Sequence, residues 1–284
     1  MTTNNPSPHS GPAGATNPRA GLVRIVTDSS SCLPPQVAQQ LDITVLPVHH
    51  MEDGDTQTTA GLSALELTAA YARQLERGGD AGVVALHLSK EISSTWAAAV
   101  TAAGVFPEGQ VKVIDTQQAG MAVGAAAMAA ARLAADGANL QQCTDIAQDT
   151  LSRAHTWLYV HSTDHLRRSG RISAASALLS TAFAIKPIMH LAGGKLELAA
   201  KTRTQVKAWT KLLELAITHA GGQPAFVAVQ HADAAESAEH LAQLLREQLP
   251  AGSSISVMPL SPIIAVHAGP GAVAISCIAH IGAS

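Results

Sequence analysis

The chain has 284 residues, 47% of them hydrophobic, and a formal net charge of −3. This length and apolar content predict a folded protein of two domains of ordinary size. The 18 Lys and Arg residues are scattered singly and form no basic stripe, which argues against a nucleic-acid partner. The longest apolar run, Met121 to Ala131, is well short of the ~20 residues that span a bilayer, so we expect no integral membrane segment.

The first twenty residues are built largely from Pro, Gly, Ser, Thr and Asn, which predicts a disordered tail and not a secretory signal. Cys32, Cys143 and Cys277 lie far apart and include no Cys-x-x-Cys pair. An odd number of separated cysteines without a signal peptide is typical of a reducing compartment, so we expect a cytoplasmic protein. The 13 histidines are dispersed, and we predict no metal site.

Short apolar strands alternate with helical patterns from Leu22 to about Thr156. This alternation predicts an α/β fold with a mostly parallel, doubly wound sheet, and we assign residues 21–156 to an N-terminal α/β domain. Pro47 marks a strand at the edge of the sheet or a bulge. The strands are expected at 22–26, 43–50, 83–88 and 111–115, and the helices at 35–41, 62–75, 96–103 and 119–135.

The pattern changes from Trp157 onward, and we assign residues 157–284 to a smaller, mixed α/β C-terminal domain. A helix is expected up to about Phe183, followed by a hairpin with strands at 185–191 and 196–199. Two further helices and three further strands are expected at 205–219, 235–248, 225–229, 255–260 and 272–278.

A polar turn, Ser89 to Thr95, follows the buried strand 83–88 and precedes a helix. Backbone N–H groups at a helix start lack internal partners and carry the positive end of the helix dipole, so hydroxyls there can complete an anion site. The alternative is that Ser93 or Ser94 only caps the helix. The threonines of Thr56–Thr59 also precede a helix, and capping is again the alternative.

Several stretches, taken in order, resemble the DegV family of bacterial fatty-acid-binding proteins. They cover nearly all of the chain after residue 20. They are Thr27-Asp28-Ser29 with Leu33-Pro34, the Ser89–Thr95 turn, Val113-Ile114-Asp115-Thr116, Gly170-Arg171-Ile172-Ser173, Ile185-Lys186-Pro187-Ile188, Lys201-Thr202-Arg203 and His267-Ala268-Gly269-Pro270-Gly271-Ala272.

The resemblance implies two α/β domains that hold a long-chain fatty acid in a tunnel between them. It also implies a carrier that does no chemistry alone and presents the acid to an ATP-dependent fatty acid kinase, whose acyl phosphate serves phospholipid synthesis. No other cofactor is implied. By position, the resemblance implies that the carboxylate contacts are Ser93 and either Thr58 or Thr59. Arg171 and His267 would lie behind them, near the same end. Arg203 would face the head group or the docked kinase.

The chain departs from the usual family pattern at a few positions. Ser94 stands where a glycine is usual, Thr204 replaces the glycine after Arg203, and Cys32 replaces an aspartate before Leu-Pro. None of these changes removes a hydrogen-bond donor from the expected carboxylate site.

A rival hypothesis is a serine-dependent hydrolase or acyltransferase. Ser93 would be its nucleophile and His267 its base, oriented by Asp28 or Asp115. The chain has no Gly-x-Ser-x-Gly elbow, which argues against this hypothesis. A nucleotide-binding protein is a second rival, but no Gly-rich fingerprint or P-loop follows any predicted strand.

Overall fold

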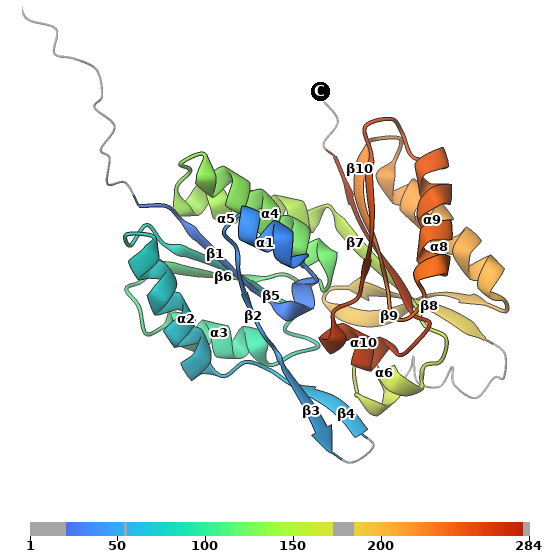
Figure 1. Cartoon of the computed structure of the whole chain (residues 1–284), viewed down its shortest axis with the longest axis horizontal. Coiled ribbons are helices and arrows are strands. Elements are labelled where there is room, and N and C mark those ends of the chain that lie inside the picture. Colours follow the sequence, from blue (N-terminus) through green and yellow to red (C-terminus); the bar gives the residue numbers. More distant parts are fainter. Residues whose placement is uncertain (1–20, 54–55, 173–184, 281–284) are drawn as a thin grey trace, which may run out of the picture.

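The computed structural model describes residues 21–53, 56–172 and 185–280, and in it two sheets lie side by side (Figure 1). The first sheet has four parallel strands in the order β2-β1-β5-β6. These are β1 (Arg24–Asp28), β2 (Thr44–Leu46), β5 (Val83–His87) and β6 (Val111–Asp115). The α/β class and the parallel sheet are therefore confirmed.

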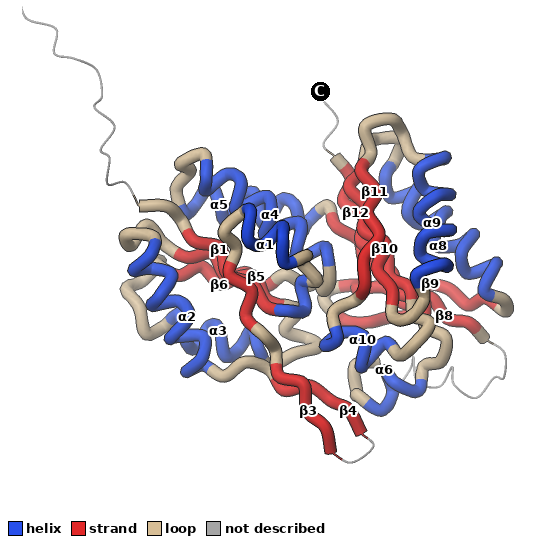
Figure 2. Tube along the Cα trace, viewed as in Figure 1, coloured by secondary structure: helices blue, strands red, loops and turns tan. Residues whose placement is uncertain are grey.

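Helices cover both faces of the first sheet (Figure 2). On one face lie α2 (Ala64–Arg77) and α3 (Thr95–Ala103), and on the other lie α1 (Pro35–Gln40), α4 (Met121–Ala135) and α5 (Leu140–Ser152). The residues of β5 are all buried, as a strand covered on both faces requires. The helix α5 was not predicted, although Asn139 and Gln142 form the capping box that begins it.

The second sheet has six strands in the order β11-β10-β12-β7-β8-β9, with one parallel pair, β10 and β11. One face is covered by α8 (Gln205–Ala220) and α9 (Ala235–Gln248), while the other packs toward α4. The expected hairpin, the two helices expected after it and the expected strands are present. The strands are β7 (Ala154–Tyr159), β8 (Lys186–Ala192), β9 (Lys195–Thr202), β10 (Ala225–His231), β11 (Ser254–Pro259) and β12 (Val273–Ala279).

The segment between β2 and α2 differs from the expectation. The single strand expected at 43–50 divides at Pro47, and β3 (His49–Asp53) pairs with β4 (Thr56–Ala60) as an antiparallel hairpin. The threonines lie in a strand and do not cap α2, because the hydroxyl of Ser63 accepts the Glu66 N–H instead. Pro47 follows the edge strand β2, as expected.

Three short helices complete the described structure: η1 (Ser29–Ser31), α6 (Asp164–Arg168) and α10 (Pro262–Ala268). The expected tail, 1–20, and most of the helix expected before Phe183 lie outside the described residues. The strand β7 begins at Ala154, and the domain boundary at residue 156 stays a prediction.

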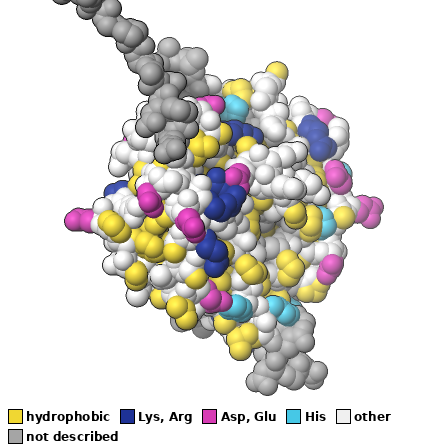
Figure 3. Space-filling view, turned by 60° about the vertical axis from the view of Figure 1, so that its left-hand side comes forward, with side chains coloured by type: hydrophobic (Ala, Val, Ile, Leu, Met, Phe, Trp, Pro, Cys, Tyr) yellow, Lys and Arg dark blue, Asp and Glu magenta, His cyan; other side chains and the backbone are white. Residues whose placement is uncertain are grey.

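Among the described helices, none is both long and apolar enough to cross a membrane. On the face drawn in Figure 3, Lys and Arg side chains alternate with Asp and Glu side chains and with hydrophobic and uncharged atoms. This face therefore presents no extended area of a single charge.

Candidate functional site

A cavity of about 460 Å³ lies between the two sheets. Its size falls within the roughly 300–1,000 Å³ of ordinary small-molecule sites. Its lining comes from both halves of the chain, with Val48 and Leu88 on the first-sheet side and Leu158, Leu191 and Leu196 on the second. Most of the wall is apolar, so the cavity suits a ligand with a substantial hydrophobic part.

Polar side chains from four separate segments line the cavity near α10. Thr59 comes from β4, Ser93 from the turn before α3, Arg171 from the segment after α6, and His267 from α10. The Thr59 Oγ1 and His267 Nε2 atoms lie 2.9 Å apart, although the residues are 208 positions apart in the chain. We call these four residues the polar end of the cavity.

The turn before α3 holds Ser93 through local hydrogen bonds. The Ser93 Oγ accepts the Thr95 N–H at 3.2 Å and lies 3.1 Å from Thr95 Oγ1. The N-cap of α3 is Ser94, whose side chain makes no capping hydrogen bond, whereas Ser93, one residue earlier, accepts the first N–H of the helix and also lines the cavity. A hydroxyl hydrogen rotates about its C–O bond, so Ser93 can turn its proton toward a ligand.

Ser94 fits this turn without strain, although a glycine is usual there. Its φ of −76° lies in the right-handed helical region, so glycine is not required at this position. Gly61 packs against it, because a Cβ at position 61 would lie 2.6 Å from the Ser94 Oγ. The close approach brings the loop after β4 against the start of α3.

Arg171 and His267 determine the charge of the polar end. Burial, together with smaller effects of the nearby Arg171 and His165, lowers the pKa of His267 to about 4. The imidazole is therefore neutral at pH 7. Burial also lowers the pKa of Arg171, but a guanidinium remains protonated in proteins.

No described carboxylate forms an ion pair with Arg171, whose guanidinium donates to the Ser169 carbonyl. The polar end thus combines one lasting positive charge with hydroxyls and an imidazole. A partly buried cation without an anionic partner is costly. This arrangement favours an anionic group on the ligand.

The other two predicted contacts lie elsewhere. Successive strand residues face opposite sides of a hairpin, and Thr58 is not among the cavity residues, whereas Thr59 is. Arg203 is exposed, directly after β9. It lies at the same end of the second sheet as His161, because Thr202 pairs with Lys186 and Lys186 Nζ is 3.2 Å from the His161 carbonyl oxygen.

The residues named for a hydrolase do not form a triad. His267 contacts Thr59 and has no hydrogen bond to Ser93 among the described contacts. Asp115 forms an ion pair with Lys90 at 2.9 Å. Asp28, the other candidate, is the fully buried last residue of β1, and its carboxylate contacts His87.

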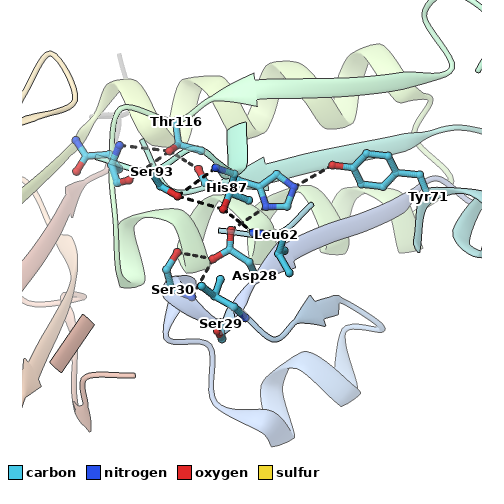
Figure 4. A network of polar contacts seen from close by, with 11 residues as sticks. Asp28, Ser29, Ser30, Leu62, Tyr71, His87, Ser93 and Thr116 are labelled. Carbon is cyan, nitrogen blue, oxygen red and sulfur yellow. Dashed lines mark hydrogen bonds and ion pairs between the residues drawn. The ribbon is translucent and has the colours of Figure 1, made fainter. Parts of the chain in front are cut away.

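Asp28 belongs to a buried polar network (Figure 4). Its Oδ2 is 2.8 Å from His87 Nδ1, while His87 Nε2 is 2.9 Å from the Tyr71 hydroxyl, and Asp28 Oδ1 accepts the Ser30 N–H at 2.9 Å. The His87 and Asp28 side chains are fully buried. Sequence analysis did not single out His87, although a histidine in an otherwise apolar strand was a visible signal.

The fold and cavity define a class of two-sheet α/β proteins with an apolar internal cavity that ends in a cationic, hydroxyl-bearing group. A family model described as "Uncharacterised protein, DegV family" matches residues 48–280. A DegV domain-containing protein of Corynebacterium glutamicum is 59% identical over 256 residues, which cover 90% of this chain and 93% of that protein. The chain belongs to the DegV family.

Solved structures agree with this assignment. The crystal structure of a DegV family protein from C. glutamicum matches with a TM-score of 0.90 and 57% identity, covering 93% of this chain and 99% of that one. A DegV family protein from Thermus thermophilus, described by its fatty acid binding, matches with a TM-score of 0.84 and 27% identity, covering 91% and 100%. DegV from Bacillus subtilis, described as a fatty acid binding protein, matches with a TM-score of 0.80 and 26% identity, covering 91% and 99%.

Proposed function

We propose that this protein binds a long-chain fatty acid in the cavity between its sheets, with the carboxylate at the polar end. The observation that carries the proposal is the cavity itself, whose apolar wall ends at Arg171, Thr59, Ser93 and His267. Burying the acyl chain contributes about 0.8 kcal/mol per methylene. The carboxylate needs several donors once it leaves water, and these side chains provide them. The fatty acid binding of the relatives from T. thermophilus and B. subtilis supports the proposal.

In the same proposal the protein is a carrier, and the phosphoryl transfer belongs to an ATP-dependent fatty acid kinase that docks at the polar end. The acyl phosphate so formed would enter phospholipid synthesis in the cytoplasm. The exposure of Arg203 supports a docking role, because an exposed side chain is accessible to a partner. An exposed arginine can pair with carboxylates of a partner without taking part in holding the lipid.

Substitution of each of two adjacent threonines tests the proposed carboxylate site. Thr59→Val removes a hydroxyl that lines the cavity, whereas Thr58→Val removes one that does not. Thr59→Val should weaken fatty-acid binding by about 1–3 kcal/mol, the usual cost of an unsatisfied buried group, and Ser93→Ala should do the same. The measurement is equilibrium binding of octadecanoic acid to delipidated protein.

Thr58→Val is the matched control, because it makes the same chemical change on the same strand and should leave the affinity unchanged. Equal affinities for the two valine variants would contradict the placement of the carboxylate beside Thr59.

Arg203→Ala separates fatty-acid binding from the presentation of the acid to the kinase. It should leave the fatty acid bound and reduce acyl-phosphate formation when the partner kinase and ATP are supplied, because its side chain is exposed. Lipid occupancy and phosphoryl transfer are measured on the same samples. Arg246→Ala, an exposed arginine on α9 at the outer face, is the control and should affect neither quantity. A variant at 203 that empties the cavity would show that Arg203 serves the lipid and not the partner.

A further inference from the structure

The cavity has a second polar region, which lies on the second sheet. Gln230, Ala274 and Leu158 are directly opposite one another on β10, β12 and β7, and all three line the cavity. In this row of cavity-lining positions Gln230 is the one polar residue. Thr156, two residues from Leu158 on the same strand face, also lines the cavity.

The Gln230 side chain is held in one orientation. Its Oε1 accepts the Met121 N–H at 3.0 Å, at the start of α4. Since a backbone N–H requires an acceptor, this contact identifies Oε1 and places the Nε2 group on the other side of the amide. Gly120 makes the approach possible, because a Cβ there would lie 2.8 Å from Oε1.

Gln230 is only 1% exposed, and its buried Nε2 group has no hydrogen-bond partner among the described residues. The amide also lies near the Cys32 thiol, where it lowers the thiol pKa against the larger rise that burial causes. An unsatisfied buried donor of this kind is unusual and costly, which calls for a partner.

A second hydrogen-bond donor comes from the hydroxyl pair of Thr156 and Ser276. The Thr156 Oγ1 and Ser276 Oγ atoms lie 3.3 Å apart, and no other hydrogen bond of either hydroxyl is among the described contacts. Two hydroxyls carry two protons, and one shared bond uses only one of them. This part of the wall therefore offers donors to the cavity from both Gln230 and Thr156.

Arg171 and Gln230 are held against different strands of the second sheet. Ile172, next to Arg171, forms a bridge with Leu196 on β9, whereas Gln230 lies on β10, with β12, β7 and β8 in between. Both residues line the same cavity, so a ligand held by its carboxylate at Arg171 can bring another part of its chain to Gln230.

We propose that Gln230 and Thr156 form a subsite for an oxygen atom on the acyl chain, so that the protein prefers hydroxylated or keto long-chain acids to unsubstituted ones. This inference rests on the proposed fatty-acid binding and specifies its substrate class. A hydroxyl or carbonyl oxygen on the chain accepts from Nε2 and from the threonine hydroxyl, which satisfies donors that a methylene chain leaves unpaired.

The test is a competition on the delipidated full chain. Equal amounts of octadecanoic acid and of monohydroxyoctadecanoic acids, with the hydroxyl at successive positions along the chain, are offered together, and the retained acids are quantified by mass spectrometry. At least one positional isomer should be retained about tenfold over octadecanoic acid, the effect of one net hydrogen bond. Gln230→Met should bring the two acids to equal retention, and Thr156→Val should reduce the preference.

Three results would overturn the inference. Equal retention of all acids by the wild type, or a preference for octadecanoic acid, would show that the subsite takes no ligand oxygen while leaving fatty-acid binding intact. A preference that persists in both variants would place the recognition elsewhere. Retention of none of the acids would remove the proposed function and this inference together. Thr156→Val provides the answer if Gln230→Met does not fold, because Thr156 has no bond to α4.

Discussion

Replacing His87 with leucine should destabilise the protein by about 3–5 kcal/mol, the usual cost of leaving a buried carboxylate without its partner. The Asp28 carboxylate is fully buried, and its Oδ2 atom has His87 Nδ1 as its partner at 2.8 Å. The Tyr71 hydroxyl would also lose its partner. Because domains are typically stable by only 5–15 kcal/mol, the loss should be obvious in urea unfolding monitored by circular dichroism.

His49→Leu is the control for this prediction. His49 forms an ion pair with Glu66 at 2.7 Å, but both side chains are largely exposed. Exposed pairs contribute about 0–1 kcal/mol, so this variant should unfold close to the wild type. Similar stabilities for the two variants would show that the Asp28–His87 pair is not an important source of stability.

Replacing Arg171 with methionine should weaken fatty-acid binding by about 2–5 kcal/mol, more than the loss of any hydroxyl at the polar end. The guanidinium is the permanent charge at this end, and burial already lowers its pKa. A carboxylate withdrawn from water depends on such a partner. The ligand-free variant should be no less stable than the wild type, because the substitution removes a poorly solvated charge. Titration calorimetry with octadecanoic acid measures the affinity, and thermal unfolding measures the stability.

Two further variants make this prediction specific. Arg168→Met changes an exposed arginine three residues earlier and should leave binding unchanged. Arg171→Lys keeps the charge without the planar guanidinium and should restore part of the affinity. If Arg171→Met binds as well as the wild type, the carboxylate does not lie at the polar end.

The fold was largely predictable because its strands are short, apolar runs separated by clear turns. The regions that were wrong or missed depend on the pairing of two weakly apolar strands or on polar surfaces. The threonines of β4 were predicted to precede a helix, with capping as one alternative. Thr56–Ala60 instead form a strand, because they pair with β3. The helix α5 has few apolar residues, and its capping box at Asn139 was its clearest local signal.

The candidate site was predictable only in part. Sequence resemblance implied Ser93, Arg171 and His267, and all three line the cavity. It left Thr58 and Thr59 as alternatives, and the alternation of a strand that was not predicted distinguishes them. Gln230 and His87 were not identified. Their importance comes from Met121 and Asp28, partners 109 and 59 positions away in the chain.

Native mass spectrometry of the protein purified from a bacterial host tests the central claim most directly. The spectrum should contain a species whose excess mass equals one long-chain fatty acid, and lipid extraction followed by chromatography should identify that acid. The same species should be depleted in Arg171→Met and retained in Arg168→Met. A wild-type protein that carries no fatty acid, and that takes up none when it is delipidated and offered octadecanoic acid, would contradict the account.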